Sequence, residues 1–267
     1  MSDASPTWVG LAWALLPMLA VMVVLWRLKL GQVGSLSIAA TRLTVQITIL
    51  GWALGFLFAA DSPVVMLAVA LAMTAVSAFT VGSRGSDTTG RLRLEAFVAI
   101  ALGAMTVMIV AITLSLGVRP WYDARVVIPM LGMILGNSVN GVSLAADRLA
   151  GELRTGRDLI ELRLALGATW RQASLPAARA AVATALTPTI NSMMIAGIVA
   201  VPGMMTGQIL AGADVNRALR YQILMYFLIA GTVGISTLAL LSVRLARAFT
   251  ASHQLRRDQV APAARDR

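Results

Sequence analysis

Residues 94–117 read LEAFVAIALGAMTVMIVAITLSLG, an apolar run whose single charged residue, Glu95, stands near its start. A helix rises about 1.5 Å per residue, so a run of this length matches a bilayer hydrocarbon core of about 30 Å. Apolar runs of at least about 18 residues are typical of membrane-spanning helices. The segment therefore indicates a membrane protein, and similar apolar runs occur along the rest of the chain.

The whole composition agrees with a membrane protein. Of the 267 residues, 58% are hydrophobic and 13% are charged, with a mean hydropathy of +0.80. Soluble domains are about 45–50% apolar and about 25% charged, so no large water-soluble domain fits. We predict an all-α integral membrane protein with a transmembrane domain over residues 1–251 and a disordered, polar tail over residues 252–267. The seven predicted spans are 7–26, 36–59, 64–81, 94–117, 126–146, 183–210 and 222–245.

The first span is predicted to stay in the mature protein. Its leader carries Asp3 and no basic cluster, and its basic residues, Arg27 and Lys29, come after it, which is not the order of a cleavable signal peptide. The alternative is a six-span protein in which residues 8–26 lie at the membrane interface.

Basic residues divide unequally between alternate sides of the predicted spans. One side holds 17 Lys and Arg residues and the other holds four, Arg119, Arg125, Arg217 and Arg220. By the positive-inside rule the richer side is cytoplasmic, which places the N-terminus outside and the C-terminus in the cytoplasm. The net charge of +10 is thus explained by topology, and nucleic acid is not an expected partner.

Several kinds of chemistry are excluded by residue counts. The chain has no Cys and one His, so it has no disulfide, no thiolate metal site and no multi-His zinc site. Its single Lys, Lys29, lies in RLKLGQ and not in a Walker A motif, so the chain has no ATPase site of its own. Its acidic residues lie at span ends or in loops, which weakens the alternative of an ion-gradient-driven carrier. The short predicted outside loops also argue against a signal-relay subunit.

The long cytoplasmic loop, residues 147–182, has charges and Leu or Ala residues at helical spacing. It predicts amphipathic helices joined near Gly156 and Gly167, and Gly167 can adopt a positive φ that ends one of them. The spacing from Glu161 to Gly167 resembles the coupling-helix loop of ABC transporter permeases, which docks on an ATP-binding subunit. The alternative is an ordinary pair of interfacial helices. The candidate coupling residues are Glu161, Arg163, Leu166, Gly167 and Ala168.

Polar residues within the spans form a predicted belt. Arg42 and Gln46 share a helix face, as do Asn137 and Asn140, and Asn191 lies at a similar depth. A buried Arg needs protein or water around it, so the set predicts a substrate pathway. Any single Asn could instead serve only to join helices.

A second group surrounds an expected break in the sixth span. Pro202 lacks an N–H and Gly203 loosens the helix, and with Gly136 and Gly141 they are candidate hinges. Met204, Met205 and Gln208 follow the break and are added to the candidate pathway. Thioether sulfur binds soft metal ions, but methionine also fills irregular apolar cores, so the metal assignment stays unknown.

Four motifs together resemble the FetB family of ABC-type iron-export permeases, which includes plant aluminium-tolerance half-transporters. They are GMILGNSVNG at 132–141, LALGAT at 164–169, TPTINSMMIAGIVAVPGMMTGQILAG at 187–212, and YQI at 221–223. The resemblance covers the chain from RLTVQ at 42–46 to the seventh span, with PGMMTGQIL as its most specific part. It implies a permease homodimer in a bacterial inner membrane, paired with a separate subunit that binds ATP and Mg²⁺ and powers export. The substrate, iron or another metal-linked solute, is not fixed by these residues.

Overall fold

The computed structural model describes residues 7–59, 62–84, 90–250 and 254–256. The described residues fall into two compact units, within Met1–Ala60 and Asp61–Arg267, which are considered separately. In the first, α1 (Trp8–Arg27) begins after Thr7, whose hydroxyl accepts a hydrogen bond from the Gly10 amide, and packs against α2 (Val33–Ala59). No residue of α2 is buried.

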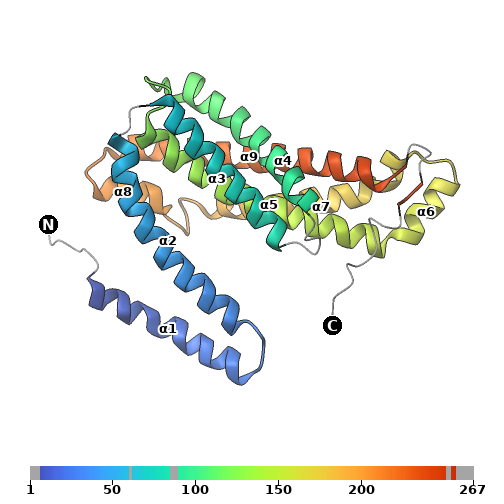
Figure 1. The fold of residues 1–267 in the computed structure, drawn as a ribbon, viewed down its shortest axis with the longest axis horizontal. Coiled ribbons are helices and arrows are strands. Elements are labelled where there is room, and N and C mark those ends of the chain that lie inside the picture. Colours follow the sequence, from blue (N-terminus) through green and yellow to red (C-terminus); the bar gives the residue numbers. More distant parts are fainter. Residues whose placement is uncertain (1–6, 60–61, 85–89, 251–253, 257–267) are drawn as a thin grey trace. The chain divides into compact units, whose positions relative to one another are not determined.

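The second unit is a bundle of long helices (Figure 1). Its elements are α3 (Pro63–Arg84), α4 (Gly90–Ile109), the π-helical turn η1 (Val110–Leu116), α5 (Ala124–Thr155), α6 (Arg157–Ala165), α7 (Trp170–Ile195), α8 (Gly203–Leu210) and α9 (Val215–Ala248). Helix α5 contacts α3, α4, α7 and α9, and it therefore forms the centre of this unit. Helix α4 also packs along α9.

Close helix approach depends on small residues at the crossings. A Cβ atom built at Gly103 of α4 would lie 2.2 Å from Ser236 Oγ of α9, and one built at Gly141 of α5 would lie 2.6 Å from Val233 Cγ1 of α9. Neither position has room for a side chain. An ion pair between Glu95 of α4 and Arg247 of α9 also joins α4 to α9.

Six helices of the described chain are long and apolar enough to cross a membrane. They are Val9–Arg27, Val33–Ala59, Pro63–Gly82, Arg91–Leu116, Ala124–Thr155 and Val215–Ala248. Helix α7 is outside this set because Arg179, Asn191 and several Thr, Ser and Pro residues lower its hydropathy. The predicted all-α membrane fold is confirmed, whereas the number of spans stays a prediction.

The predicted sixth span, 183–210 with an expected break at Pro202 and Gly203, is divided between two helices. Helix α7 begins at Trp170 and ends at Ile195, and α8 begins only at Gly203, after Pro202. Gly197 between them has a φ of 81°, which lets the chain turn where a helix cannot continue. The predicted break is real, but it starts seven residues before Pro202, at the end of α7.

Helix α5 continues beyond the predicted span 126–146 to Thr155, directly before the joint predicted near Gly156, and Arg148 and Glu152 form an i,i+4 ion pair of 2.7 Å on its surface. The end of the chain differs from the prediction. Within the tail predicted to be disordered, residues 254–256 fold back on the end of α9. The Arg256 amide donates to the Ala248 carbonyl at 2.8 Å, and the Thr250 amide donates to the Gln254 carbonyl at 2.8 Å. Residues 252–253 and 257–267 lie outside the described residues.

Candidate functional site

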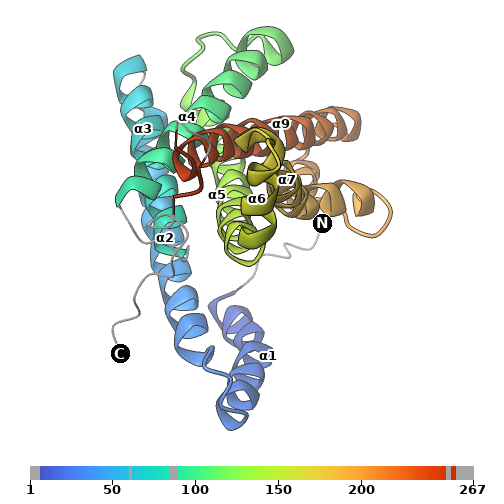
Figure 2. The same ribbon diagram turned by 90° about the vertical axis from the view of Figure 1, so that its right-hand side faces the viewer.

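Helix α6 lies at one end of the bundle and is set off from it by two glycine joints (Figures 1 and 2). Gly156 separates α6 from α5. Gly167 follows α6 with a φ of 89°, and its amide donates to the Leu164 carbonyl while the Ala168 amide donates to the Arg163 carbonyl, both at 3.0 Å. These bonds form a Schellman motif, which requires a left-handed residue at this position. Both joints predicted from the sequence are confirmed.

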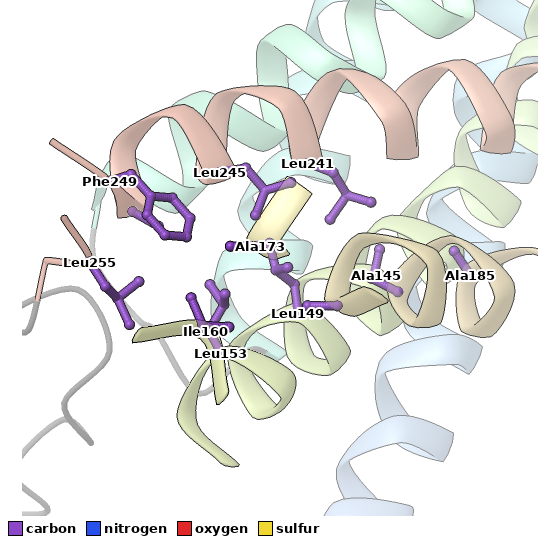
Figure 3. Close-up of a cluster of buried hydrophobic side chains, with 13 residues drawn as sticks. Ala145, Leu149, Leu153, Ile160, Ala173, Ala185, Leu241, Leu245, Phe249 and Leu255 are labelled. Carbon is purple, nitrogen blue, oxygen red and sulfur yellow. The ribbon is translucent and has the colours of Figure 1, made fainter. Parts of the chain in front are cut away.

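A buried apolar cluster attaches α6 to the long helices, and we call it the end cluster (Figure 3). It takes side chains from α5, α6, α7, α9 and the segment after α9. Its members are Ala145, Leu149, Leu153, Ile160, Ala173, Ala177, Ala181, Ala185, Leu241, Leu245, Ala248, Phe249 and Leu255. Ile160 is the α6 residue in this cluster and is only 4% exposed, so it anchors the helix.

The turn from α6 to α7 is fixed by polar contacts. The Thr169 hydroxyl accepts from the Gln172 amide, and the Gln172 side chain accepts from the Thr169 amide at 2.9 Å, which makes a capping box at the start of α7. Arg163 Nη1 donates to the Ala173 carbonyl at 3.3 Å. The T-x-x-Q spacing at 169–172 is the capping-box signature and could have located this helix start.

The opposite side of α6 is exposed and rich in leucine. Leu159, Leu162 and Leu166 are 52%, 55% and 78% exposed. Their i, i+3, i+7 spacing places them on one helix face, which we call the leucine face. Of these, only Leu166 was predicted from the sequence as a coupling residue. Leucine spacing alone did not show which side of the helix would be covered.

Glu161 has a partner within α6. Its carboxylate accepts a hydrogen bond from Arg157 Nε at 2.9 Å, and both side chains are about two-fifths exposed, at 36% and 40%. The structure thus brings the five candidate coupling residues into α6 and the turn after it. Their role in coupling stays a prediction.

On α5, the candidate pathway residues lie on a face that the bundle leaves open. Asn137 and Asn140 are exposed, and Asn137 Nδ2 donates to the Met133 carbonyl at 2.8 Å, one turn back. No described atom lies within 4 Å of a Cβ built at Gly136. The two glycines therefore differ in the space around them, because Val233 and the Ala185 carbonyl of α7 occupy the space where a side chain at Gly141 would lie.

The remaining candidates of the second unit lie on α7 and α8. Asn191 is exposed near the end of α7, whereas Met204, Met205 and Gln208 are partly buried on α8, which packs against α9. The Gln208 Oε1 atom is buried and accepts no hydrogen bond from the described residues. Pro202 is the N-cap of α8 and Gly203 its first residue.

Arg42 and Gln46 belong to the first unit. Both are exposed on α2, one helical turn apart. The belt that would join them to Asn137, Asn140 and Asn191 therefore stays a prediction. Within the described part of the chain, no group of three or more His, Asp or Glu residues is placed to hold a metal ion.

Comparison with known proteins gives consistent matches over nearly the full length. A family model described as "Uncharacterised protein family (UPF0014)" matches residues 8–249. The chain is 36% identical to the UPF0014 membrane protein slr1647 of Synechocystis, over 93% of this chain and 96% of that protein. It is 30% identical to the probable iron export permease protein FetB of Escherichia coli, over 92% and 93%. It is 28% identical to the protein ALUMINUM SENSITIVE 3 of Arabidopsis thaliana, over 91% and 87%. No solved structure matches the chain.

Proposed function

Because the chain belongs to the UPF0014 family of membrane proteins, we propose that it is the membrane-spanning permease subunit of an ABC transporter. The chain itself is a multi-pass α-helical membrane protein. In this proposal a separate subunit binds ATP and Mg²⁺ in the cytoplasm and supplies the energy. Two permease copies span a bacterial inner membrane, and the chain has no catalytic activity of its own.

The observation that carries the proposal is the two-sided construction of α6. One side is anchored by Ile160 in the end cluster, and the other presents Leu159, Leu162 and Leu166 to solvent. A short helix beyond the ends of long helices is a poor place for exposed leucines unless another protein covers them. Docking of an amphipathic helix into a groove is a common way to recognise such a face.

The end cluster connects α6 mechanically to the long helices. Ile160 belongs to the same buried cluster as Leu149 and Leu153 of α5, Ala173 of α7 and Leu245 of α9. Arg163 also ties α6 to the first turn of α7. A closely packed cluster transmits displacement because its side chains have no free space to absorb it. Movement of the ATP-binding subunits against α6 would then shift α5 and α7 together.

The proposed cargo is iron or another metal-linked solute, moved out of the cytoplasm. This follows from the relative named a probable iron export permease. We assign the pathway to the polar and thioether side chains that the sequence analysis singled out. They are Arg42, Gln46, Asn137, Asn140, Asn191, Met204, Met205 and Gln208.

The test is to co-express the chain with a candidate ATP-binding subunit from the same organism, and to purify the complex through a tag on this chain. The double variant Leu162→Asp/Leu166→Asp adds two charges to the leucine face without touching the end cluster. We expect it to weaken co-purification about tenfold or more, since about 1.4 kcal/mol of lost docking energy has that effect. ATP hydrolysis that responds to cargo should be lost with it.

The matched control is Leu175→Asp, which adds a charge at an exposed leucine of α7 outside the leucine face. It should leave both association and ATP hydrolysis unchanged. Normal association of the double variant would remove the coupling role of α6. Transport by the chain alone, under an ion gradient in liposomes, would instead support a secondary carrier of a small solute or chelate.

A further inference from the structure

The turn that follows α1, residues 28–32, has a lysine where a glycine is expected, and we call it the α1–α2 turn. The Lys29 amide donates to the Trp26 carbonyl at 3.1 Å, and the Leu30 amide donates to the Leu25 carbonyl at 3.1 Å. These two bonds form a Schellman motif. Lys29 holds its left-handed position with a φ of 53°, and it is the one residue other than glycine with a positive φ in the part of the chain that the structure describes.

Two other helix ends of this chain show which residue the motif prefers. Gly167 after α6 and Gly212 after α8 hold the same position, with φ values of 89° and 86°. At α8 the Gly212 amide donates to the Ile209 carbonyl, and the next amide donates to the Gln208 carbonyl, as in the α1–α2 turn. Glycine takes this conformation freely, whereas a Cβ atom strains it. A strained residue at a glycine position points to a function for its side chain.

The α1–α2 turn, which joins the first two helices in Figure 1, contains a cavity of about 580 Å³. Arg27 and Lys29 line it, together with the ring of Trp26. Its lining also includes Leu25 of α1 and Val33 of α2, which are partly buried. A cavity with two cations and apolar walls suits a ligand that has an anionic group and hydrocarbon.

The positive charge of this cavity is not balanced by nearby acidic residues in the sequence. Residues 7–59 contain three basic residues, Arg27, Lys29 and Arg42, and no Asp or Glu. The side chains of Arg27 and Lys29 are both exposed. An anion from the surroundings is therefore the natural partner of these two cations.

The residues around the cavity suit the headgroup layer of a membrane. Helices α1 and α2 are both long and apolar enough to span it, so the turn lies at the end of two spans. Trp26 is 71% exposed, and Leu28 and Leu30 beside Lys29 are 63% and 56% exposed. Tryptophan and long cationic side chains are typical of this layer. The turn also belongs to the side predicted to be cytoplasmic, where the membrane surface is negatively charged.

We propose that the α1–α2 turn binds the phosphate group of an anionic phospholipid. Arg27 donates hydrogen bonds to two phosphate oxygens through its planar guanidinium, and Lys29 adds a compact positive charge. Trp26, Leu25 and Val33 contact the glycerol and the first carbons of the acyl chains. Basic pockets between membrane helices on the cytoplasmic side bind such headgroups. The inference does not depend on ATP-driven transport, because the site lies wholly within the first unit.

The test measures backbone hydrogen exchange in the full chain, purified in a neutral detergent. Phosphatidylglycerol, which is anionic, and phosphatidylcholine with the same acyl chains, which has no net charge, are added in parallel. At about ten times its dissociation constant, phosphatidylglycerol should slow exchange in residues 28–34 about tenfold, because bound ligand suppresses local opening. Phosphatidylcholine should leave this exchange unchanged. Inorganic phosphate should also leave it unchanged, because it lacks the apolar part that the cavity walls contact.

Lys29→Gly separates lipid binding from stability. It removes one cation and also relieves the strained backbone, since glycine adopts a φ of 53° freely. It should weaken the affinity for phosphatidylglycerol about fivefold, while the unfolding temperature without lipid stays equal or rises. Arg27→Gln, a second variant in which the turn keeps its lysine, should weaken the affinity to a similar extent. The matched control is Arg220→Gln, which removes an exposed arginine of α9 outside the first unit and should bind phosphatidylglycerol at the native affinity.

Three results would overturn the inference. Native affinity for phosphatidylglycerol in both Lys29→Gly and Arg27→Gln would mean that the two cations do not hold the headgroup. Equal protection by phosphatidylcholine would mean that the cavity takes acyl chains without regard to charge. Equal protection by inorganic phosphate would mean that the turn binds a free anion and not a lipid.

Discussion

The sequence predicts that Gly136 and Gly141 are both hinges of α5. Their surroundings in the structure are opposite. A Cβ built at Gly141 would lie 2.6 Å from Val233 Cγ1 and 3.4 Å from the Ala185 carbonyl oxygen, whereas no described atom lies within 4 Å of one built at Gly136. Gly141 therefore permits the crossing of α5, α7 and α9. Periodicity alone cannot separate the two glycines, because both stand at small-residue positions of one apolar helix.

This contrast predicts opposite effects of the same substitution. Gly141→Ala should lower thermal stability in detergent, since adding a methyl group to a filled site typically costs about 1–3 kcal/mol. Gly136→Ala should raise it, because alanine is favoured over glycine in a helix by up to about 1 kcal/mol. Adding Val233→Ala to Gly141→Ala should restore part of the loss. Equal changes for the two glycine variants would contradict the packing at Gly141.

At the scale of elements, α6 and the turn around it were predictable because their signals are local. Glycine at 156 and 167 interrupts helical spacing, and Gly167 adopts the positive φ that a helix end needs. A helix after Gly167 was predicted, but not its continuation into the span predicted from residue 183, because hydropathy locates membrane crossings and not helix ends. Helix α7 begins in a polar segment with Thr169 as its cap and continues through Arg179 without interruption.

The residue types of the candidate pathway could be predicted from the sequence, but their arrangement as a site could not. The pairing of Asn137 with Asn140 follows from helical spacing, and both are indeed on the exposed side of α5. Which helix face is buried depends on the contacts of α5 with five other helices, and no local pattern encodes those contacts. The leucine face of α6 was missed for the same reason.

The segment after α9 is a further element that sequence reasoning misjudged, and it predicts a role for Leu255. This side chain is 9% exposed and belongs to the end cluster together with Ile160 of α6. Leu255→Asp places a charge in that cluster, so the attachment of α6 should loosen. Backbone amides of α6 should exchange hydrogen about tenfold faster, while those of α3 stay unchanged, because local opening depends on local packing.

Gln254→Asp is the control for Leu255→Asp, since it adds the same charge at an exposed neighbouring residue. It should leave exchange in α6 at the native rate. If both variants behave alike, the segment does not hold α6 in place.

At the scale of the whole molecule, the distribution of charge along the long helices sets the orientation in the membrane. Helix α9 has 34 residues and extends about 50 Å, enough to cross the hydrocarbon and both headgroup regions. It carries Arg217 and Arg220 in its first turns and Arg244 and Arg247 near its end. The basic residues of this helix alone therefore favour neither orientation. The bias comes from the chain as a whole, with 17 basic residues on one predicted side and four on the other.

That bias predicts which ends of the helices a reagent added to intact cells can reach. Leu166→Cys after α6 and Leu210→Cys at the end of α8 are exposed positions, at 78% and 73%, in a chain with no other cysteine. A maleimide that cannot cross the membrane should label Leu210→Cys in intact cells that express the protein, and Leu166→Cys only after the membrane is opened. Lys and Arg near span ends resist translocation, so the α6 end should stay with the basic side. Labelling of Leu166→Cys from outside would invert the topology and place α6 out of reach of any cytoplasmic ATP-binding subunit.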